Sequence, residues 1–220
     1  MKDIPIFTTQ TGTASLILRE IPYQQTAYVL VRTLFHNDAS DLLSECGAFC
    51  VQAGAERVLA AWPDHPLNLP VDHEMVELSR PKAGLPRPDP AVPLTPLTRD
   101  NAPTYQTIYN RLFHRISGAA SCRSEDINRL LTTGTAFLAL QDGIPAGIGE
   151  IEGSDLRAVG VLPEYRGLGR HLTLTLLHRL PGPELCLSAA STNERAMRLY
   201  NSLGFRPRRT LVRWYLVTER

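Results

Sequence analysis

The hydrophobic and polar positions of the chain follow two periods. Apolar residues that alternate with polar ones, or that form short runs, predict strands, and apolar residues at every third or fourth position predict amphipathic helices. In the first third of the chain these patterns predict strands over 14–20, 27–34 and 56–62 and a helix over 39–53. This order of elements indicates a small α/β unit.

The same periods predict a longer series of elements beyond residue 100. Helices are expected over 104–113, 124–131 and 168–180 and before Gly204, and strands over 135–140, 146–152, 156–161, 184–189 and 210–217. Gln141-Asp142-Gly143 is typical of a hairpin turn, and Ser191 to Glu194 has the spacing of a capping box that opens the last helix. The second half is therefore predicted to be a larger α/β (α+β) domain.

A proline-rich segment separates these two regions. Six of the seventeen prolines lie in residues 79–96, which show almost no apolar periodicity. Such a composition is typical of an extended, semi-rigid connector. The sequence therefore predicts a small α/β domain over 1–78, a linker over 79–90 and a second domain over 91–220.

Composition narrows the class of protein. Of the 220 residues, 43% are hydrophobic and 20% are charged, as in ordinary globular proteins, and the formal net charge is only +1. This charge gives no general attraction for nucleic acid or for an anionic membrane, so neither is expected as a partner. No run approaches the roughly 18 apolar residues of a membrane span, and the N-terminus lacks a cleavable leader pattern. We expect a cytoplasmic protein.

Two groups of residues raise the question of metal binding. The four cysteines form no CxxC pair and are expected to be buried free thiols. A polar cluster contains Asp64, His65, Asp72, His73 and Glu74, but it lacks a metal-ligand spacing such as HExxH. A solvated loop is predicted there, and no metal is expected.

The strongest chemical signal is Arg166-Gly-Leu-Gly-Arg170, between a predicted strand and a predicted helix. Backbone N–H groups at a helix N-terminus, together with two arginines, favour a phosphate or pyrophosphate. A Rossmann fingerprint needs a third glycine where Leu172 stands, and a Walker loop needs Gly-Lys-Ser/Thr, so both are excluded. A Gly-x-Gly turn that only tightens the loop remains an alternative.

Two segments resemble motifs of the GNAT acetyltransferases. Val161 to Arg170 resembles their coenzyme A pyrophosphate loop, and Asn193 to Phe205 resembles their later helix motif. The resemblance covers residues 91–220 and implies the GNAT fold, a mixed and mostly antiparallel central sheet flanked by helices. Cys50 to Ala60 repeats the helix, glycine, strand order found around Gly204. A reduced GNAT-like N-terminal half would give this repeat, as would an unrelated helix that ends at glycine.

The resemblance implies a site for acetyl-coenzyme A. The residues implied to bind it are Val159, Gly160, Val161, Arg166, Gly167, Leu168, Gly169, Arg170, His171, Asn193 and Ala196. An amide near Gly160 or Val161 is implied to stabilise the oxyanion of the reaction. His171 departs from the family pattern, which has Gly or Ala there. Its side chain leans toward the helix N-terminus, where it either donates a hydrogen bond to the phosphate or crowds it.

Acetyl transfer to an amine requires a base, because an amine is protonated at neutral pH and attacks only through its lone pair. Glu150, Glu152 and Asp155 are the candidates, with Asp155 or Glu150 nearest the position usual in the family. Solvated carboxylates at a strand edge are the alternative for each. Tyr200 matches the tyrosine that protonates the departing thiolate in the family, and its alternative role is to fill the core.

These residues predict an acetyl-coenzyme A-dependent N-acetyltransferase that acts on a primary amine. The acceptor could be a small metabolite, an amino acid, a polyamine or a protein amine, and a different acyl group could enter the same cleft. The alternative is a catalytically inactive sensor or interaction module that binds coenzyme A. The N-terminal half is hypothesised to cover one wall of the acceptor groove or to make a homodimer contact.

Overall fold

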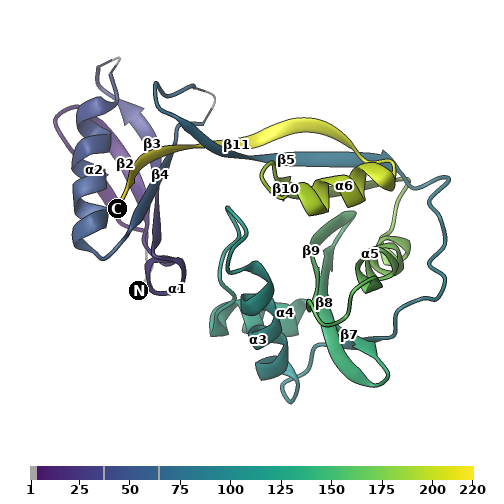
Figure 1. The fold of residues 1–220 in the computed structure, drawn as a ribbon. Helices are drawn as coiled ribbons and strands as arrows, with labels where there is room; N and C mark the ends of the chain where they lie inside the picture. Colours follow the sequence, from purple (N-terminus) through teal and green to yellow (C-terminus); the bar gives the residue numbers. More distant parts are fainter. Residues whose placement is uncertain (1–3, 37, 64) are drawn as a thin grey trace. The chain divides into compact units, whose positions relative to one another are not determined.

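A computed structural model of the protein describes residues 4–36, 38–63 and 65–220. The chain forms two compact units (Figure 1). The first unit comprises Met1–Met75 and Thr210–Arg220, and the second unit comprises Val76–Arg209. The C-terminal residues therefore fold with the N-terminal ones, whereas the sequence places all residues from 91 onward in one domain.

The first unit is a sheet with one long helix. Its elements are β1 (Ile6–Thr8), β2 (Gly12–Ile17), α1 (Ile21–Gln24), β3 (Thr26–Leu34), α2 (Ser40–Gln52) and β4 (Arg57–Ala61). Parts of β5 (Val71–Pro81) and β11 (Arg206–Glu219) complete the sheet in the order β1-β2-β3-β4-β11-β5. Leu42, Cys46 and Cys50 of α2 pack with Val29 and Val58 of the sheet. The apolar stripe of the predicted helix thus builds this core.

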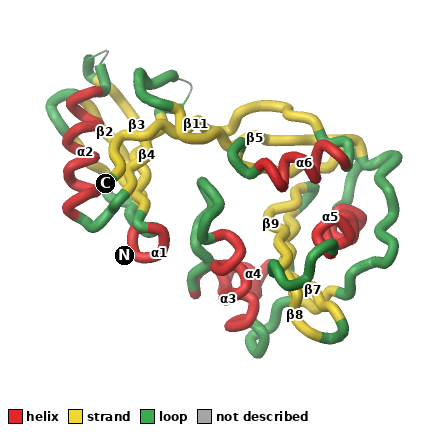
Figure 2. Tube along the Cα trace, in the orientation of Figure 1, coloured by secondary structure: helices red, strands yellow, loops and turns green. Residues whose placement is uncertain are grey.

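The second unit is a larger sheet with helices on both faces (Figure 2). Its elements are β6 (Leu94–Pro96), α3 (Ala102–Phe113), α4 (Ser124–Thr133), β7 (Ala136–Gln141), β8 (Ile144–Glu152), β9 (Asp155–Val161), α5 (Leu168–Arg179), β10 (Glu184–Ala190) and α6 (Glu194–Ser202). The strand order is β6-β7-β8-β9-β10-β5-β11. Phe137 of β7 packs with the leucines of α5, and its neighbour Leu138 packs with Tyr105 and Ile127 of α3 and α4. The predicted central sheet flanked by helices is confirmed.

Most predicted elements lie where the sequence places them. At the β7–β8 hairpin, Asp142 and Gly143 have φ values of 53° and 78°, the left-handed pair that a tight hairpin turn requires. The start predicted for the last helix is wrong: Asn193, not Ser191, caps α6 by accepting a hydrogen bond from the Ala196 N–H (3.2 Å). The short elements β1, α1 and β6 are not predicted by the sequence patterns.

Strand β5 is the largest difference from the sequence prediction. Asp72, His73 and Glu74 were expected in a solvated loop, but they lie within β5, and His73 is buried. The strand escapes detection because it alternates charged residues that pair with arginines. Glu77 accepts a hydrogen bond from Arg209 (3.1 Å), and Asp72 contacts His73 Nδ1 (2.6 Å). Asp64 lies outside the described residues.

The proline-rich segment after β5 packs on the second unit. The Lys82 N–H donates a hydrogen bond to the Pro183 carbonyl (2.8 Å), the Lys82 ammonium contacts the Leu180 carbonyl, and Leu85 is buried. These residues were expected to form a connector. The contacts hold them instead against the end of α5 and the start of β10.

The cysteines are free thiols, and Cys46, Cys50 and Cys122 are buried while Cys186 is half-buried. Burial raises the pKa of Cys46 to about 12 and that of Cys50 to about 11, so both are protonated at neutral pH. Over the described part of the chain, no helix has the length and apolar character that crossing a membrane requires.

Candidate functional site

Strands β9 and β10 of the second unit separate along their length. They are parallel, but their register joins only two residue pairs, Asp155 with Cys186 and Leu156 with Leu187. Beyond these pairs β9 continues to Val161 and β10 to Ala190. On its other side β9 stays paired with β8 as far as Val161. The carboxyl ends of β9 and β10 therefore leave backbone groups unpaired between them.

Alternation along β9 determines which amides face this opening. The Leu162 N–H donates to the Ala146 carbonyl at the start of β8 (2.8 Å). Because successive N–H groups of a strand point to opposite sides, the N–H of Gly160 also points toward β8, and those of Val159 and Val161 point away from it. Gly160 instead permits close packing, since an added Cβ would lie 2.7 Å from Leu112 Cδ1 of α3.

The turn between β9 and α5 is built on glycine. Gly167 caps α5 with φ of +92°, a left-handed conformation that strains other residues. Apart from the adjoining residues and the backbone of α5 itself, no heavy atom lies within 4 Å of a Cβ built on Gly167 or Gly169. The Leu168 N–H donates to the Tyr165 carbonyl (3.4 Å), whereas the N–H groups of Gly169 and Arg170 lack intrahelical acceptors, and no side chain caps them. Open space and unsatisfied donors thus coincide at this helix N-terminus.

Two arginines and one histidine surround these donors. Arg166 and Arg170 are exposed, and the first turn of α5 contains no acidic residue. Arg170 Nη1 donates to Ser202 Oγ of α6 (2.9 Å), which fixes its guanidinium near this turn. His171 is half-buried, and its Nδ1 atom is buried without a hydrogen-bond partner. The local charge is positive, as an anion site requires.

Helix α6 begins beside the carboxyl end of β10. The Asn193 carboxamide oxygen accepts from the Ala196 N–H, and the residue is half-buried. This capping role leaves the carboxamide NH₂ of Asn193 as its remaining donor. Asn193 and Ala196, which the resemblance implies as binding residues, therefore both lie at the start of α6.

Tyr200 lies one helical turn beyond Ala196 and is buried in the main core of the second unit. Its ring packs edge-on to Phe205, with 6.1 Å between ring centroids. Burial raises the pKa of Tyr200 to about 12. The hydroxyl is therefore protonated throughout the neutral range and can act only as a proton donor there.

Glu150 is a buried carboxylate on β8, opposite Ala158 of β9. Arg129 Nη2 of α4 lies 3.4 Å from Glu150 Oε1, and the arginine side chain is half exposed. Burial raises the pKa of Glu150, and the charge of Arg129 offsets part of this effect. Glu150 pairs with Ala158, the neighbour of Val159, and its raised pKa makes its carboxylate a stronger base than an exposed glutamate.

Asp155 lies at the opposite end of β9. It pairs with Glu152 on β8 and with Cys186 on β10, where the two parallel strands are still joined. At about 3.3 Å per residue, it is roughly 13 Å along the strand from Val159. The structure thus separates the two candidate bases, and Glu150 is the one beside the opening.

The sequence did not identify three features of this site. Arg129 and Tyr105 approach Glu150 from helices distant in the chain, and the buried Tyr105 hydroxyl has no hydrogen-bond partner. Burial, with the nearby Glu150 charge, raises the pKa of Tyr105. Glu150 pairs with Ala158 and the next residue, Ile151, pairs with Leu156, so Arg157 between them is unpaired and forms a bulge on β9. No local pattern marks such long-range contacts, although bulges are common beside active sites.

Solved structures share the fold over nearly the whole chain. A conserved protein of unknown function from Staphylococcus epidermidis has a TM-score of 0.57 at 11% identity, covering 98% of this chain and 94% of that one. A GCN5-related N-acetyltransferase from Sphaerobacter thermophilus has a TM-score of 0.53 at 15% identity, covering 94% and 76%. A tandem GNAT protein from the clavulanic acid biosynthesis pathway has a TM-score of 0.52 at 13% identity, covering 100% and 85%. The chain has the GNAT fold.

The GNAT similarity includes the first unit, because each of these alignments covers more than nine tenths of the chain. No family model and no curated protein matches the sequence. In the second unit, Val159 and Val161 of β9, Leu168 of α5 and Ala196 of α6 pack against the core cluster that contains Tyr200. Among the residues that the structure describes, no group of three His, Cys, Asp or Glu side chains could hold a metal ion.

Proposed function

We propose that the second unit transfers an acetyl group from acetyl-coenzyme A to a primary amine. The observation that carries this proposal is the separation of β9 from β10, which leads directly to the open, positively charged start of α5. Acetyl-coenzyme A has a matching form, a polar chain of amides that ends in a pyrophosphate. The GNAT fold, known in solved acetyltransferases, supports the same assignment.

The residues present suit this donor substrate. The pyrophosphate is held by the free N–H groups of α5 and by Arg166, in the space that Gly167 and Gly169 leave open. The chain of amides bonds to the backbone of Val159 and Val161 and to the carboxamide NH₂ of Asn193. His171 Nδ1 is buried and has no hydrogen-bond partner. When this atom carries a proton, it can donate a hydrogen bond to a phosphate oxygen.

The chemical steps follow from the groups at the opening. Glu150 removes a proton from the ammonium group of the acceptor, and the amine lone pair then forms a bond to the thioester carbon. The N–H of Val159 or Val161 stabilises the resulting oxyanion, since these amides face away from β8. The carbon–sulfur bond breaks, and the Tyr200 hydroxyl donates its proton to the thiolate that leaves. The second proton on the new amide nitrogen passes to the Tyr200 phenolate, and the proton held by Glu150 passes to water.

The test is thermal unfolding with and without acetyl-coenzyme A, followed by a thiol-release assay with a panel of amines. Ligand at a hundredfold over its dissociation constant stabilises the folded state by about 2.7 kcal/mol, which corresponds to a shift of roughly 5 to 10 °C for a chain of this size. No shift at millimolar acetyl-coenzyme A would contradict the proposal. A clear shift without thiol release from any amine would favour the inactive coenzyme A-binding module.

A further inference from the structure

A cavity of about 390 Å³ lies at the start of α2 in the first unit. Strands β3 and β4 are parallel, α2 connects them, and the cavity is bounded by the first turns of α2 and the loop after β4. Sheets of this kind bind ligands outside the carboxyl ends of their strands. The volume falls within the range of roughly 300 to 1,000 Å³ that is typical of small-molecule sites.

The walls of this cavity are largely apolar. Leu43 comes from α2, Trp62 and Leu69 from the loop after β4, and Val217 from β11. The Trp62 ring packs against the ring of His65, with 4.3 Å between the centroids, which restricts its motion. An indole beside aliphatic side chains suits a ligand with an apolar or aromatic body.

The polar groups at the rim are acidic or neutral. Asp38 lines the cavity together with Ser40 and Asn68, and no Lys, Arg or His is among the described residues that line it. Asp38 Oδ1 accepts hydrogen bonds from the Ser40 hydroxyl (2.7 Å) and the Ser40 N–H (2.9 Å). These bonds hold the carboxylate in place and lower the pKa of Asp38, so it is ionised at neutral pH.

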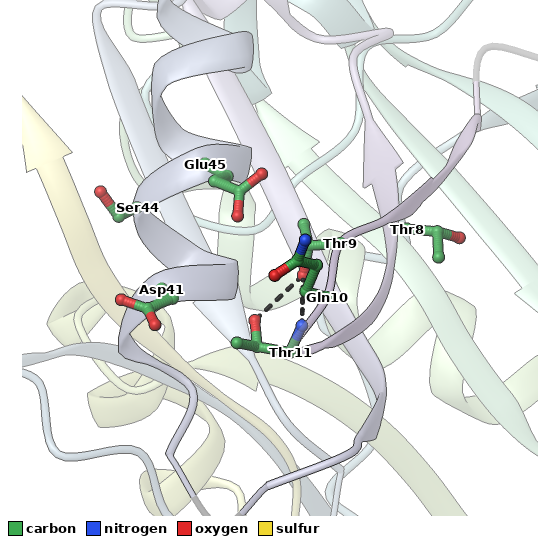
Figure 3. A pocket seen from close by; sticks show the side chains of 7 residues that line it. All are labelled: Thr8, Thr9, Gln10, Thr11, Asp41, Ser44 and Glu45. Carbon is green, nitrogen blue, oxygen red and sulfur yellow. Dashed lines mark hydrogen bonds between the residues drawn. The ribbon is translucent and has the colours of Figure 1, made fainter.

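Negative charge continues on the neighbouring face of α2. A second hollow of about 570 Å³ lies between α2 and the turn from β1 to β2, where Asp41 and Glu45 line it (Figure 3). Its threonines are engaged with one another, since Thr9 Oγ1 and Thr11 Oγ1 are 3.0 Å apart. The described residues that line this hollow are all polar or acidic, with no large apolar side chain among them. Its carboxylates add to the negative potential near the first cavity.

We propose that the cavity at Leu43 and Trp62 binds a small organic cation, an ammonium group on an apolar or aromatic body. Asp38 supplies the opposite charge, and Trp62 supplies an aromatic surface that attracts cations. The helix start at the corresponding place in the second unit carries Arg166 and Arg170 instead. The two units thus offer binding sites of opposite charge at the same position of the fold.

The probe for this site is benzyltrimethylammonium chloride, which has no N–H and so cannot be acetylated. Trp62 and Trp214 are the two tryptophans, so a Trp214→Phe variant reports on Trp62 by fluorescence. Calorimetric titration of the unchanged protein gives an independent readout. We expect saturation with a dissociation constant of about 1 mM or lower. Phenylacetate, the anionic counterpart, should not bind.

Two variants locate the bound cation. Asp38→Asn removes the charge but keeps a side chain that caps helices, and we expect about fivefold weaker binding. Ser44→Arg places a fixed cation on the exposed surface of α2 at the cavity and should abolish binding. Asp142→Asn, in the hairpin of the second unit, is the matched charge control. Absence of saturation in both readouts, equal binding of phenylacetate, or unchanged binding in both variants would overturn the proposal.

Discussion

The two units build the same motif, a strand, a helix and a parallel strand, and they differ in how far the strands stay paired. In the first unit β3 and β4 pair over five residues, from Thr26 with Arg57 to Leu30 with Ala61, which is all of β4. In the second unit β9 and β10 pair over two residues and then separate. A shared topology therefore does not specify an opening between the two strands, because the register between them decides how far they stay paired.

The starts of the two helices differ in charge. Helix α5 begins with two glycines between Arg166 and Arg170, and α2 begins after Asp38 and carries Asp41 in its first turn. The Asp38 carboxylate occupies the N–H of Ser40. A helix start that supplies its own anion has fewer vacant donors for a phosphate and repels its negative charge. The first unit is therefore unsuited to bind a second coenzyme A molecule.

The first unit also lacks a counterpart of α6. Between β4 and β5, the described residues 62, 63 and 65–70 form no helix, whereas α6 follows β10 and carries Asn193 and Tyr200. The order of the remaining elements supports the hypothesis that the first unit is a reduced GNAT half. The first unit lacks the segment equivalent to α6, which supplies the proposed general acid Tyr200 in the second unit.

Tyr200→Phe is the sharpest test of this difference. If α6 supplies the general acid, kcat should fall about 100-fold, because a positioned acid contributes on the order of 10²- to 10⁴-fold. The dissociation constant for acetyl-coenzyme A should change less than about threefold, as the ring remains in the core. Thiol release and calorimetry measure the two quantities. Tyr23→Phe, at an exposed position of the first unit, is the control. If kcat of Tyr200→Phe is unchanged, Tyr200 only fills the core.

Arg166→Glu gives the second unit the charge of the first. We expect acetyl-coenzyme A to bind roughly 30- to 100-fold more weakly, since a charge-assisted hydrogen bond is lost and a repulsive charge replaces it. Calorimetric titration measures the change. Arg99→Glu, which makes the same charge change at an exposed position of the same unit, should leave the affinity almost unaltered. Equal effects in both variants would indicate a general field and no local phosphate site.

Gly169→Ala separates binding from folding. A methyl group at Gly169 meets no atom within 4 Å beyond the adjoining residues and the backbone of its own helix, so the folded state should keep its stability or gain up to about 1 kcal/mol from helix propensity. The same methyl group would enter the proposed phosphate space, and we expect about tenfold weaker binding. Thermal unfolding and calorimetry measure both effects.

Gly54→Ala in the first unit is the counterpart of that change. Gly54 has φ of +100°, so alanine should cost about 1 kcal/mol of stability without altering coenzyme A affinity. If the Gly169→Ala variant binds acetyl-coenzyme A with the same affinity as the wild-type protein, the pyrophosphate does not lie at the start of α5.

Patterns in the sequence could predict those features of the GNAT fold that depend on residues close together in the chain. The glycines at 167 and 204 and the leucines of α5 mark a turn, a helix end and a buried face through their own chemistry. The register that opens β9 from β10 depends on packing between segments distant in sequence, and no periodicity encodes it. The pair of Glu150 and Arg129 joins residues 21 positions apart, so only the fold brings them together.

Strand β5 shows a second limit of sequence reasoning. Its alternation is carried by His73 and by charged residues such as Glu74 and Glu77, which pair with arginines of β11. A hydrophobic period cannot detect a strand whose stabilising contacts are ionic. Residues 210–220 belong to the first unit because β11 pairs with β4 from Tyr215 to Glu219, a long-range contact that no local pattern marks.

The effect of Glu150→Gln on stability, as distinct from activity, is the smallest expected, and it tests the burial that sets the proposed base apart from exposed carboxylates. Because burial raises the folded-state pKa of Glu150 above 4.5, the wild-type protein loses stability as the pH rises through that pKa. The neutral variant avoids this loss and should unfold about 2 to 4 °C higher at pH 7, the shift that roughly 1 kcal/mol produces. Below the unfolded-state pKa both proteins carry a neutral side chain, so the difference should vanish near pH 4. Arg129 remains half exposed and can be solvated without its partner. Lower stability of the variant at pH 7 would show that the ion pair with Arg129 outweighs desolvation, and Glu150 would then be a structural anion with a low pKa and no base.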